Sequence, residues 1–185
     1  MTDTLFIKNM VCNRCKITVL NLLNNEGFEV VSIQLGKIVV KENSNNDYKS
    51  LEKQLNNLGF EIIKDPSKVL VEKIKINLIQ QIENNDTDVI LTKLERGIGK
   101  RYSILSKAFS KSEGITLEKY LINLKVEKVK EYIQLKELNF SEIAYSINYK
   151  SSSHLAKQFK QVTGMSMSDY KNLHHKKRKG LDQIV

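Results

Sequence analysis

Two cysteines carry the most evident chemistry in this sequence. Cys12 and Cys15 lie in a loop that follows a predicted strand and leads into a predicted helix. Thiolates at this spacing can converge on one ion, and the helix N-terminus is expected to lower the pKa of the thiols. Ligation by sulfur alone selects soft ions, above all Cu(I), whereas Zn(II) is a competitor that needs further ligands.

Two other interpretations of the cysteine pair stay open. The pair could be a redox dithiol, although the surrounding order lacks the thioredoxin pattern, in which the motif follows a central strand of a larger sheet. The pair could also be a relic on a domain that now only packs or dimerises. We take metal binding as the prediction.

The elements that position the cysteines are predicted to form a small α/β domain. Leucine-rich runs predict helices that end at Gly27 and Gly59, and Asn46 or Asp47 is expected to cap the second of them. Gly36 marks a tight hairpin. The order strand, helix, strand, strand, helix, strand is the split βαβ, or ferredoxin-like, pattern. The predicted strands lie at residues 5–7, 28–35, 37–41 and 60–63.

With this element order, the motif Met10-x-Cys12-x-x-Cys15 resembles the heavy-metal-associated domain of copper chaperones and metal-pumping ATPases. The resemblance covers about residues 3–65. It implies that the two cysteines are the ligands and that Met10 packs inward as an anchor of the loop. Asn9 stands where the family has its usual glycine, and Val11 replaces a small polar residue, which affects the shape of the loop more than ligation.

The basic charge of the chain is confined to its second part. Residues 1–65 hold eight Lys and Arg against eight Asp and Glu, so the whole net charge of +9 lies in residues 66–185. A localised positive charge favours a polyanionic partner. The only proline, Pro66, lies at this break. We therefore predict domains at 1–65 and 66–175 and a basic tail at 176–185. The cationic run His174–Lys179, which follows the last helix, is expected to add non-specific attraction to phosphate.

Composition excludes several classes of protein. The chain is 41% hydrophobic and 28% charged, which is typical of a globular protein. Two cysteines cannot build a disulfide scaffold. No apolar run approaches the roughly 18 residues that a membrane helix needs, and no signal peptide is evident. We expect a cytoplasmic protein without a membrane partner.

An internal repeat is the most specific feature of the second part. Both copies read L-x-K-x-F-(x)4-G-x-[ST]-(x)3-Y, at an offset of 50 residues. Upstream of this motif the offset falls to 49, so the second copy has one extra residue in its turn. The repeated residues are Leu105, Lys107, Phe109, Gly114, Thr116 and Tyr120, followed by Leu155, Lys157, Phe159, Gly164, Ser166 and Tyr170.

Each copy has the pattern of a helix-turn-helix. In the second copy, Ser141 is expected to cap the first helix and Ser151 or Ser152 the second helix. Asn148 tolerates the left-handed backbone that the turn requires. A longer helix that begins at Thr116 joins the copies. We predict an α+β two-domain chain, in which a ferredoxin-like domain precedes an all-α domain with two helix-turn-helix units.

The stretch from about residue 68 to residue 173 resembles the AraC-type DNA-binding domain, in which a linker helix joins two helix-turn-helix units. The second unit matches better than the first. Glu95 stands where the family prefers Ala, Asn148 where it prefers Gly, and Met167 where it prefers Pro. Glu95 implies a first unit that docks less tightly or reads less sequence. The residues that carry the resemblance are Glu142, Ile143, Ala144, Tyr149, Leu155, Phe159, Lys160, Thr163, Gly164, Met165, Ser166 and Tyr170.

In a helix-turn-helix, the N-terminal residues of the second helix face base edges in the major groove, and two units could enter grooves roughly 34 Å apart. Base readout is expected from Arg101, His154 and Gln158. His154 could equally be a neutral residue that fills an aromatic position of the family. The lysines are expected to contact phosphate. The predicted DNA-contacting residues are Arg101, Tyr102, Ser103, Ser106, Lys107, Lys150, Ser151, Ser152, Ser153, His154, Lys157, Gln158 and Lys160.

These features together predict a bacterial transcriptional regulator that binds double-stranded promoter DNA and is not an enzyme. Our hypothesis is that Cu(I), or another soft ion, at Cys12 and Cys15 changes homodimerisation or domain docking and thereby controls metal export. One alternative is a metal chaperone or buffer whose basic domain docks an acidic protein. A CxxC oxidoreductase is a third class, and no set of nucleophile, base and orienting residue points to another enzyme.

Overall fold

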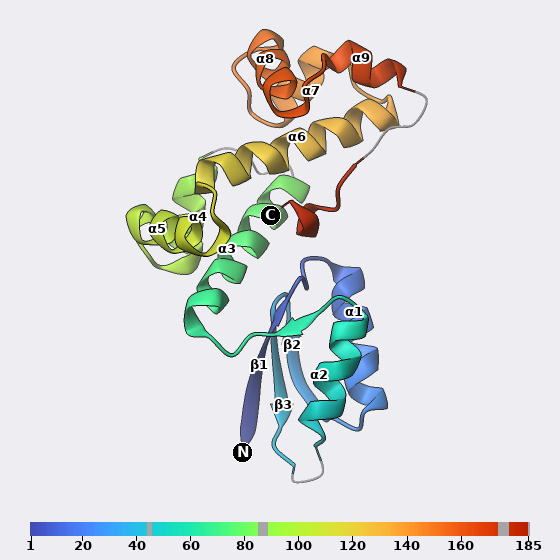
Figure 1. Ribbon diagram of the computed structural model, residues 1–185, viewed down its shortest axis with the longest axis vertical. Coiled ribbons are helices and arrows are strands. Elements are labelled where there is room, and N and C mark those ends of the chain that lie inside the picture. The colour runs from blue at the N-terminus through green and yellow to red at the C-terminus, as the bar shows by residue number, and fades with distance from the viewer. Residues whose placement is uncertain (44–45, 85–88, 174–177, 185) are drawn as a thin grey trace. The chain divides into compact units, whose positions relative to one another are not determined.

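The computed structural model describes residues 1–43, 46–84, 89–173 and 178–184 (Figure 1). The chain divides into two compact units, residues 1–76 and 77–185. Pro66 begins helix α3 (Pro66–Glu83), and the two units divide inside this helix. The sequence places its domain boundary at Pro66, and that boundary stays a prediction.

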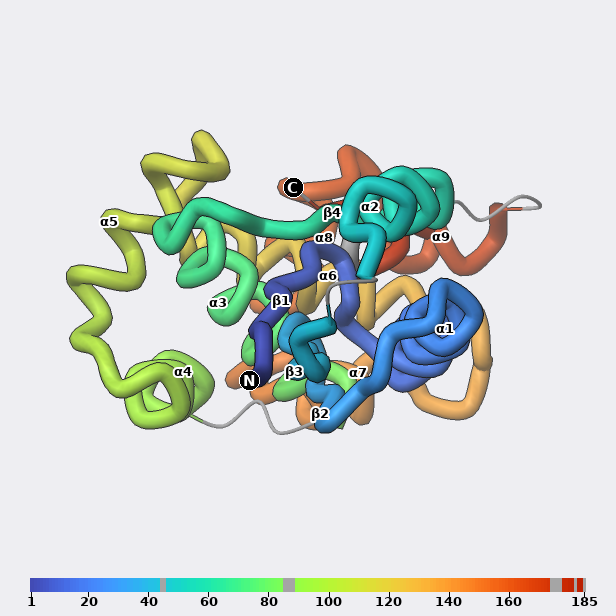
Figure 2. The backbone as a smooth tube through the Cα atoms, turned by 90° about the horizontal axis from the view of Figure 1, so that it is seen from below, coloured from blue at the N-terminus to red at the C-terminus, as the bar shows by residue number. Residues whose placement is uncertain are grey.

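The first unit is a four-stranded antiparallel sheet with two helices on one face (Figure 2). The strand order is β2-β3-β1-β4, with Leu5 opposite Ile38 and Ile7 opposite Ile62. The predicted order of strands and helices is confirmed. The elements are β1 (Thr2–Lys8), α1 (Asn13–Asn25), β2 (Val30–Gln34), β3 (Lys37–Lys41), α2 (Tyr48–Asn57) and β4 (Glu61–Ile62).

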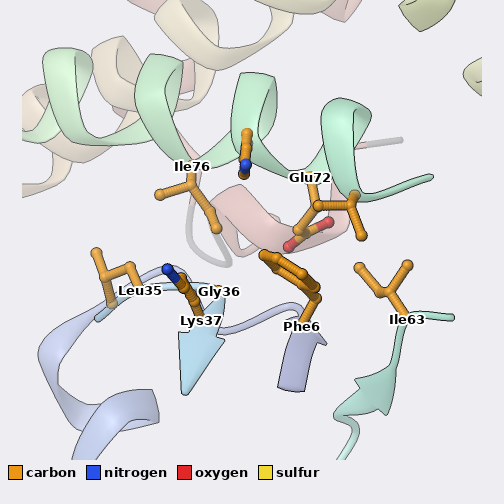
Figure 3. Close-up of a pocket in the computed structure, with 9 residues that line it drawn as sticks. Phe6, Leu35, Gly36, Lys37, Ile63, Glu72 and Ile76 are labelled. Carbon is orange, nitrogen blue, oxygen red and sulfur yellow. The ribbon is translucent and has the colours of Figure 1, made fainter. Parts of the chain in front are cut away.

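Alternation along β1 gives this sheet two different faces. Leu5 and Ile7 point into the core beneath α1 and α2, whereas Phe6 points to the other face, where the first turns of α3 lie (Figure 3). There, Gly36 allows a close approach. Its φ is +71°, and a Cβ at this position would overlap Cδ1 of Ile76. Another residue at this hairpin would therefore strain the backbone and require the Ile76 side chain to move.

The second unit consists of helices arranged at the two ends of the long helix α6 (Leu117–Leu135; Figure 1). Each predicted helix-turn-helix is present as a pair of helices. No helix in the described part of the chain has the length and apolarity required to cross a membrane. The other elements are α4 (Ile90–Ile98), α5 (Tyr102–Glu113), α7 (Phe140–Ser146), α8 (Ser152–Thr163), α9 (Met167–Asn172) and the 3-10 helix η1 (Leu181–Gln183).

The sequence repeat is a repeat of structural roles. Phe109 packs against Tyr120 with a ring-centroid distance of 5.0 Å, and Phe159 packs against Tyr170 at 5.6 Å. Gly114 ends α5 and Gly164 ends α8, both in the left-handed conformation that favours glycine. Thr116 and Ser166 then cap the next helices through their hydroxyl groups. Equal spacing in the sequence therefore builds the same local structure twice.

One predicted helix cap is wrong. Asn139, not Ser141, caps α7, because the Asn139 side chain accepts the backbone N–H groups of Ser141 and Glu142. The Glu142 carboxylate accepts the Asn139 N–H at 2.7 Å and completes a capping box. The predicted second cap is confirmed, since Ser151 accepts the His154 N–H at 3.2 Å.

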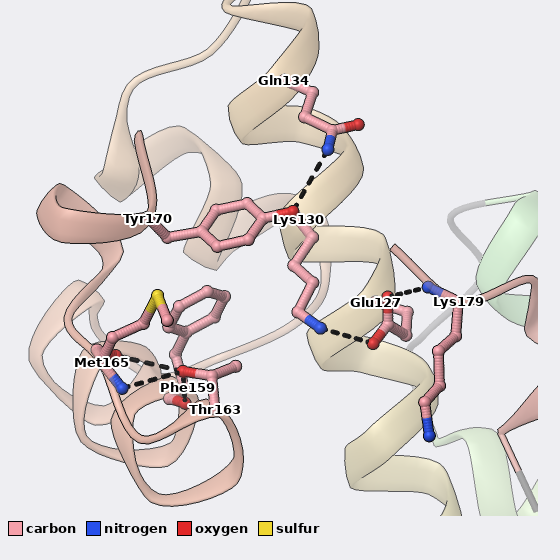
Figure 4. A network of polar contacts seen from close by, with 8 residues as sticks. All are labelled: Glu127, Lys130, Gln134, Phe159, Thr163, Met165, Tyr170 and Lys179. Atoms are coloured by element: carbon pink, nitrogen blue, oxygen red, sulfur yellow. Dashed lines mark hydrogen bonds and ion pairs between the residues drawn. The ribbon is translucent and has the colours of Figure 1, made fainter. Parts of the chain in front are cut away.

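Two acidic residues of α6 hold part of the C-terminal segment, and Figure 4 shows the contacts of one of them, Glu127. Glu127, which is buried, pairs with Lys130 at 2.6 Å and accepts the backbone N–H of Lys179 at 3.1 Å. Glu131 pairs with Arg178 at 2.8 Å. Arg178 belongs to the predicted cationic tail, but its charge is partly neutralised here. The tail residues 174–177 lie outside the described residues.

Candidate nucleic-acid interface and candidate metal site

The turns of the two helix-turn-helix units differ in length by one residue. Gly99 follows α4 and Asn148 follows α7, and both have left-handed backbone, with φ of +71° and +54°. Only Lys100 separates Gly99 from the cap of α5, whereas Tyr149 and Lys150 separate Asn148 from the cap of α8. The extra residue predicted for the second turn is thereby located between Asn148 and the helix that follows.

The N-terminus of α5 is capped by a residue of the preceding helix. The Arg101 side chain makes no capping hydrogen bond within the described part of the chain. Instead, the carboxylate of Glu95 accepts the backbone N–H of Tyr102. The Tyr102 hydroxyl donates to Glu118, and this hydrogen bond lowers the pKa of the Glu118 carboxyl. Glu95 thus has a local structural role, and the Tyr102 hydroxyl already has a partner within the chain.

The N-terminus of α8 is built differently. Ser151 provides the cap, and the exposed His154 ring packs edge-on against Tyr149 with a centroid distance of 5.3 Å. The Tyr149 hydroxyl donates to the side-chain oxygen of Gln158. The Gln158 side chain keeps its NH₂ group and the second lone pair of its oxygen for the predicted base readout. His154 has the free access to solvent that a base contact requires.

Most of the predicted DNA-contacting residues are accessible. Those that are half-buried are Tyr102, Ser106, Ser152 and Gln158. The exposed ones are Arg101, Ser103, Lys107, Lys150, Ser151, Ser153, His154, Lys157 and Lys160.

A groove lies between α6 and the start of α8, and it contains a lysine that sequence reasoning missed. Its volume is about 230 Å³. The Lys125 ammonium donates to the carbonyl oxygen of Ile147 at 3.0 Å and lies 5.2 Å from the centroid of the Tyr149 ring. Burial lowers the pKa of Lys125 and raises the pKa of Tyr149 to about 12. The available signal was a single lysine between apolar residues of the linker helix.

The two cysteines lie at the N-terminus of α1, as predicted. Cys12 is exposed and caps the helix, with its sulfur accepting the Cys15 N–H at 3.4 Å. The two Sγ atoms are 3.1 Å apart. Sulfurs bound to one ion at about 2.3 Å each lie at most about 4.6 Å apart, so both can reach a single ion. The described residues contain no cluster of three or more His, Cys, Asp and Glu that could hold a metal.

The thiol pKa differs from the expectation for a helix N-terminus. Burial raises the pKa of Cys15, and the hydrogen bond with Cys12 raises it further. Backbone N–H groups of the loop lower the pKa, but they do not outweigh burial. The expected lowering is therefore wrong for Cys15 in the metal-free chain. An ion would have to displace the thiol protons.

The loop before the cysteines is tied to α3. Asn9 has a left-handed backbone with φ of +68°, which explains why only glycine or a residue such as asparagine suits this position. The Asn9 N–H donates to Glu72 at 2.8 Å, and its side chain donates to the carbonyl oxygen of Gly59 at 2.9 Å. The Glu72 side chain, labelled on α3 in Figure 3, is only 5% exposed. Met10 is fully buried, as the resemblance implies.

Comparison with known families gives one match, in the helical part of the chain. Residues 97–173 match a family described as a helix-turn-helix domain. The match runs from the end of α4 to the residue that follows α9 and includes both α5 and α8. No curated protein gives a significant match.

Solved structures similar to the chain include three bacterial proteins. The C-terminal domain of AraT, a response regulator from Geobacillus stearothermophilus, is 23% identical, with 55% of this chain and 93% of that chain covered and a TM-score of 0.47. A DNA-binding transcriptional dual regulator from Escherichia coli K-12 is 19% identical, with 53% and 88% covered and a TM-score of 0.46. The transcriptional regulator CdpR from Pseudomonas aeruginosa is 14% identical, with 76% and 46% covered and a TM-score of 0.47.

Proposed function

We propose that this chain is a DNA-binding transcriptional regulator of the AraC type, in which α5 and α8 enter successive major grooves. The observation that carries the proposal is the duplicated helix-turn-helix, in which equivalent residues have equivalent roles. Lys107 and Lys157 occupy the same repeat position and are both exposed on their helices. The match to a helix-turn-helix domain supports the same conclusion.

The distribution of charge along the chain supports DNA as the partner. The excess of positive charge lies entirely in residues 66–185. Exposed lysines near the starts of α5 and α8 can contact phosphate and fix the position of each helix. Arg101 and His154 are exposed at equivalent ends of these helices and can hydrogen-bond base edges. Glu95 places a negative charge at the first unit, which favours weaker docking of α5 than of α8.

Selection of preferred duplexes from a random pool, followed by footprinting, tests this function. We expect protection of two segments about one helical turn apart. Arg101→Ala and His154→Ala should each relax the preference in a different segment, by about 1–3 kcal/mol per lost base contact. Gln161→Ala, at an exposed position of α8 outside the predicted interface, is the matched control. Absence of a preferred sequence would contradict the proposal and favour a protein-docking role.

We further propose that the cysteine pair senses a soft ion such as Cu(I). The donor set supports this choice, since two convergent sulfurs suit a soft ion of low coordination number better than Zn(II), which prefers four ligands. Asn9 and Glu72 offer a physical link, because their hydrogen bond joins the metal loop to α3. Movement of the loop on ion binding would change this contact at a buried carboxylate, and α3 continues into the second unit.

Titration of the selected duplex with and without Cu(I), at fixed salt, tests the sensing. We expect the affinity to change by about 5- to 150-fold, the range of an ordinary coupling free energy. The Cys12→Ser/Cys15→Ser variant should bind no stoichiometric Cu(I) and should show no change. Glu72→Gln should keep the ion, as measured by metal analysis, but lose much of the change. Identical affinities with and without bound Cu(I) would exclude the switch and leave DNA binding intact.

A further inference from the structure

The groove between α6 and α8 has an unusual chemical lining. Leu121 and Ile122 provide apolar walls, while Lys125, Lys150 and His154 bring nitrogen donors to the same space. None of the described residues that line it is a carboxylate. The volume of about 230 Å³ is far above the roughly 30 Å³ that a water molecule occupies. The groove can therefore take a group larger than water, and the nitrogen donors among its apolar walls favour an anion.

Lys125 is the central donor of this groove. Its ammonium group has three N–H donors, and the Ile147 carbonyl oxygen takes one of them. The amine also lies over the Tyr149 ring, in a cation–π contact that uses no hydrogen bond. Burial disfavours the charged amine of Lys125, whereas an anion in the groove would favour it, because opposite charges stabilise each other.

We infer that this groove binds a single phosphate group, with Lys125 at its floor and Lys150 and His154 at its rim. A phosphate has several acceptor oxygens, and three nitrogen donors, from α6, the turn before α8 and α8 itself, can bind it together. The source is either a backbone phosphate of DNA or a free phosphate ion. The first source rests on the proposed function, because Lys150 and His154 also belong to the predicted DNA interface. The second source does not.

The salt dependence of DNA binding tests the first source. Each phosphate contact contributes about 0.9 to the slope of log Kobs against log salt concentration. We expect Lys125→Gln to reduce the slope by about 0.9 on duplexes of any sequence, and Lys125→Arg to leave it nearly unchanged. Lys53→Gln removes the same charge from an exposed position of α2, and its slope should equal that of the parent chain. Thermal unfolding of each variant separates these effects from misfolding.

Titration with inorganic phosphate at constant ionic strength tests the second source. The NMR signals of the His154 ring and the Lys125 side chain report occupancy of the groove, and Lys125→Gln should abolish the saturable change at His154. Saturation with an unchanged DNA slope assigns the site to the free ion. A reduced slope without saturation assigns it to DNA. An unchanged slope together with no saturation, or with saturation that survives Lys125→Gln, overturns the inference. If the parent chain binds no duplex, the proposed function fails, and this titration still decides the site.

Discussion

Replacement of Phe159 by alanine is expected to destabilise the second helix-turn-helix by about 3–5 kcal/mol. Phe159 is fully buried and packs against Tyr170 in a core that also contains residues of α6 and α7. Loss of a buried phenylalanine costs about 3–5 kcal/mol, because transfer energy and packing are lost together. The stability of a whole domain is about 5–15 kcal/mol, so this loss is a large fraction of it. Urea unfolding followed by circular dichroism measures the difference.

The repeat provides a matched experiment. Phe109→Ala removes the equivalent side chain from the first unit, where Phe109 is also fully buried and packs against Tyr120. Each variant should remove protection from one DNA segment and retain it on the other. Gln161→Ala, on the exposed side of α8, should change neither stability nor footprint. A loss below about 1 kcal/mol for Phe159→Ala would show that its core can be emptied without disturbing the unit.

Replacement of Glu127 by alanine is expected to destabilise residues 77–185 nearly as much as Phe159→Ala does. The Glu127 side chain is 8% exposed and that of its partner Lys130 is 15% exposed. Removal of one partner leaves the other charge buried and uncompensated, which costs about 3–5 kcal/mol. The backbone N–H of Lys179 also loses its acceptor. The free energy of unfolding measures the loss, and proteolysis near the C-terminus should report release of the segment at Lys179.

A double variant distinguishes the cost of an unpaired charge from the value of the ion pair. Glu127→Leu/Lys130→Met replaces the pair by apolar side chains of similar size. Such replacements are often neutral or stabilising, because the desolvation of both charges is also removed. We expect the double variant to recover most of the stability that Glu127→Ala loses. A double variant as unstable as the single one would show that the pair itself stabilises α6.

The sequence predicted best those features that depend on local spacing. The repeat positions placed Phe109 and Phe159 in cores and located the glycines that end α5 and α8, because helix periodicity and helix termini depend on neighbouring residues. The order of strands and helices in residues 1–76 was predicted for the same reason. The burial of Met10 was also predicted, from the resemblance of the Met10-x-Cys12-x-x-Cys15 motif to the heavy-metal-associated domain.

The features that the sequence missed depend on contacts between distant residues. Glu95 looked like a departure from the family pattern, yet its carboxylate caps α5 because Arg101 provides no cap. Lys125 looked like an ordinary residue of the linker helix until Tyr149 and Ile147 were placed beside it. The pKa of Cys15 depends on the burial of one thiol, which the spacing of two cysteines does not specify.

The unequal turns have a consequence for the orientation of the protein on DNA. Because the second turn is one residue longer and its helix is capped by Ser151, whereas Glu95 caps the first, the two units present different surfaces. A symmetric pair of identical readers would bind a palindromic site equally well in either direction. A chain with two different helix-turn-helix units is asymmetric, so even a single copy should bind its site in one orientation and distinguish the upstream from the downstream end.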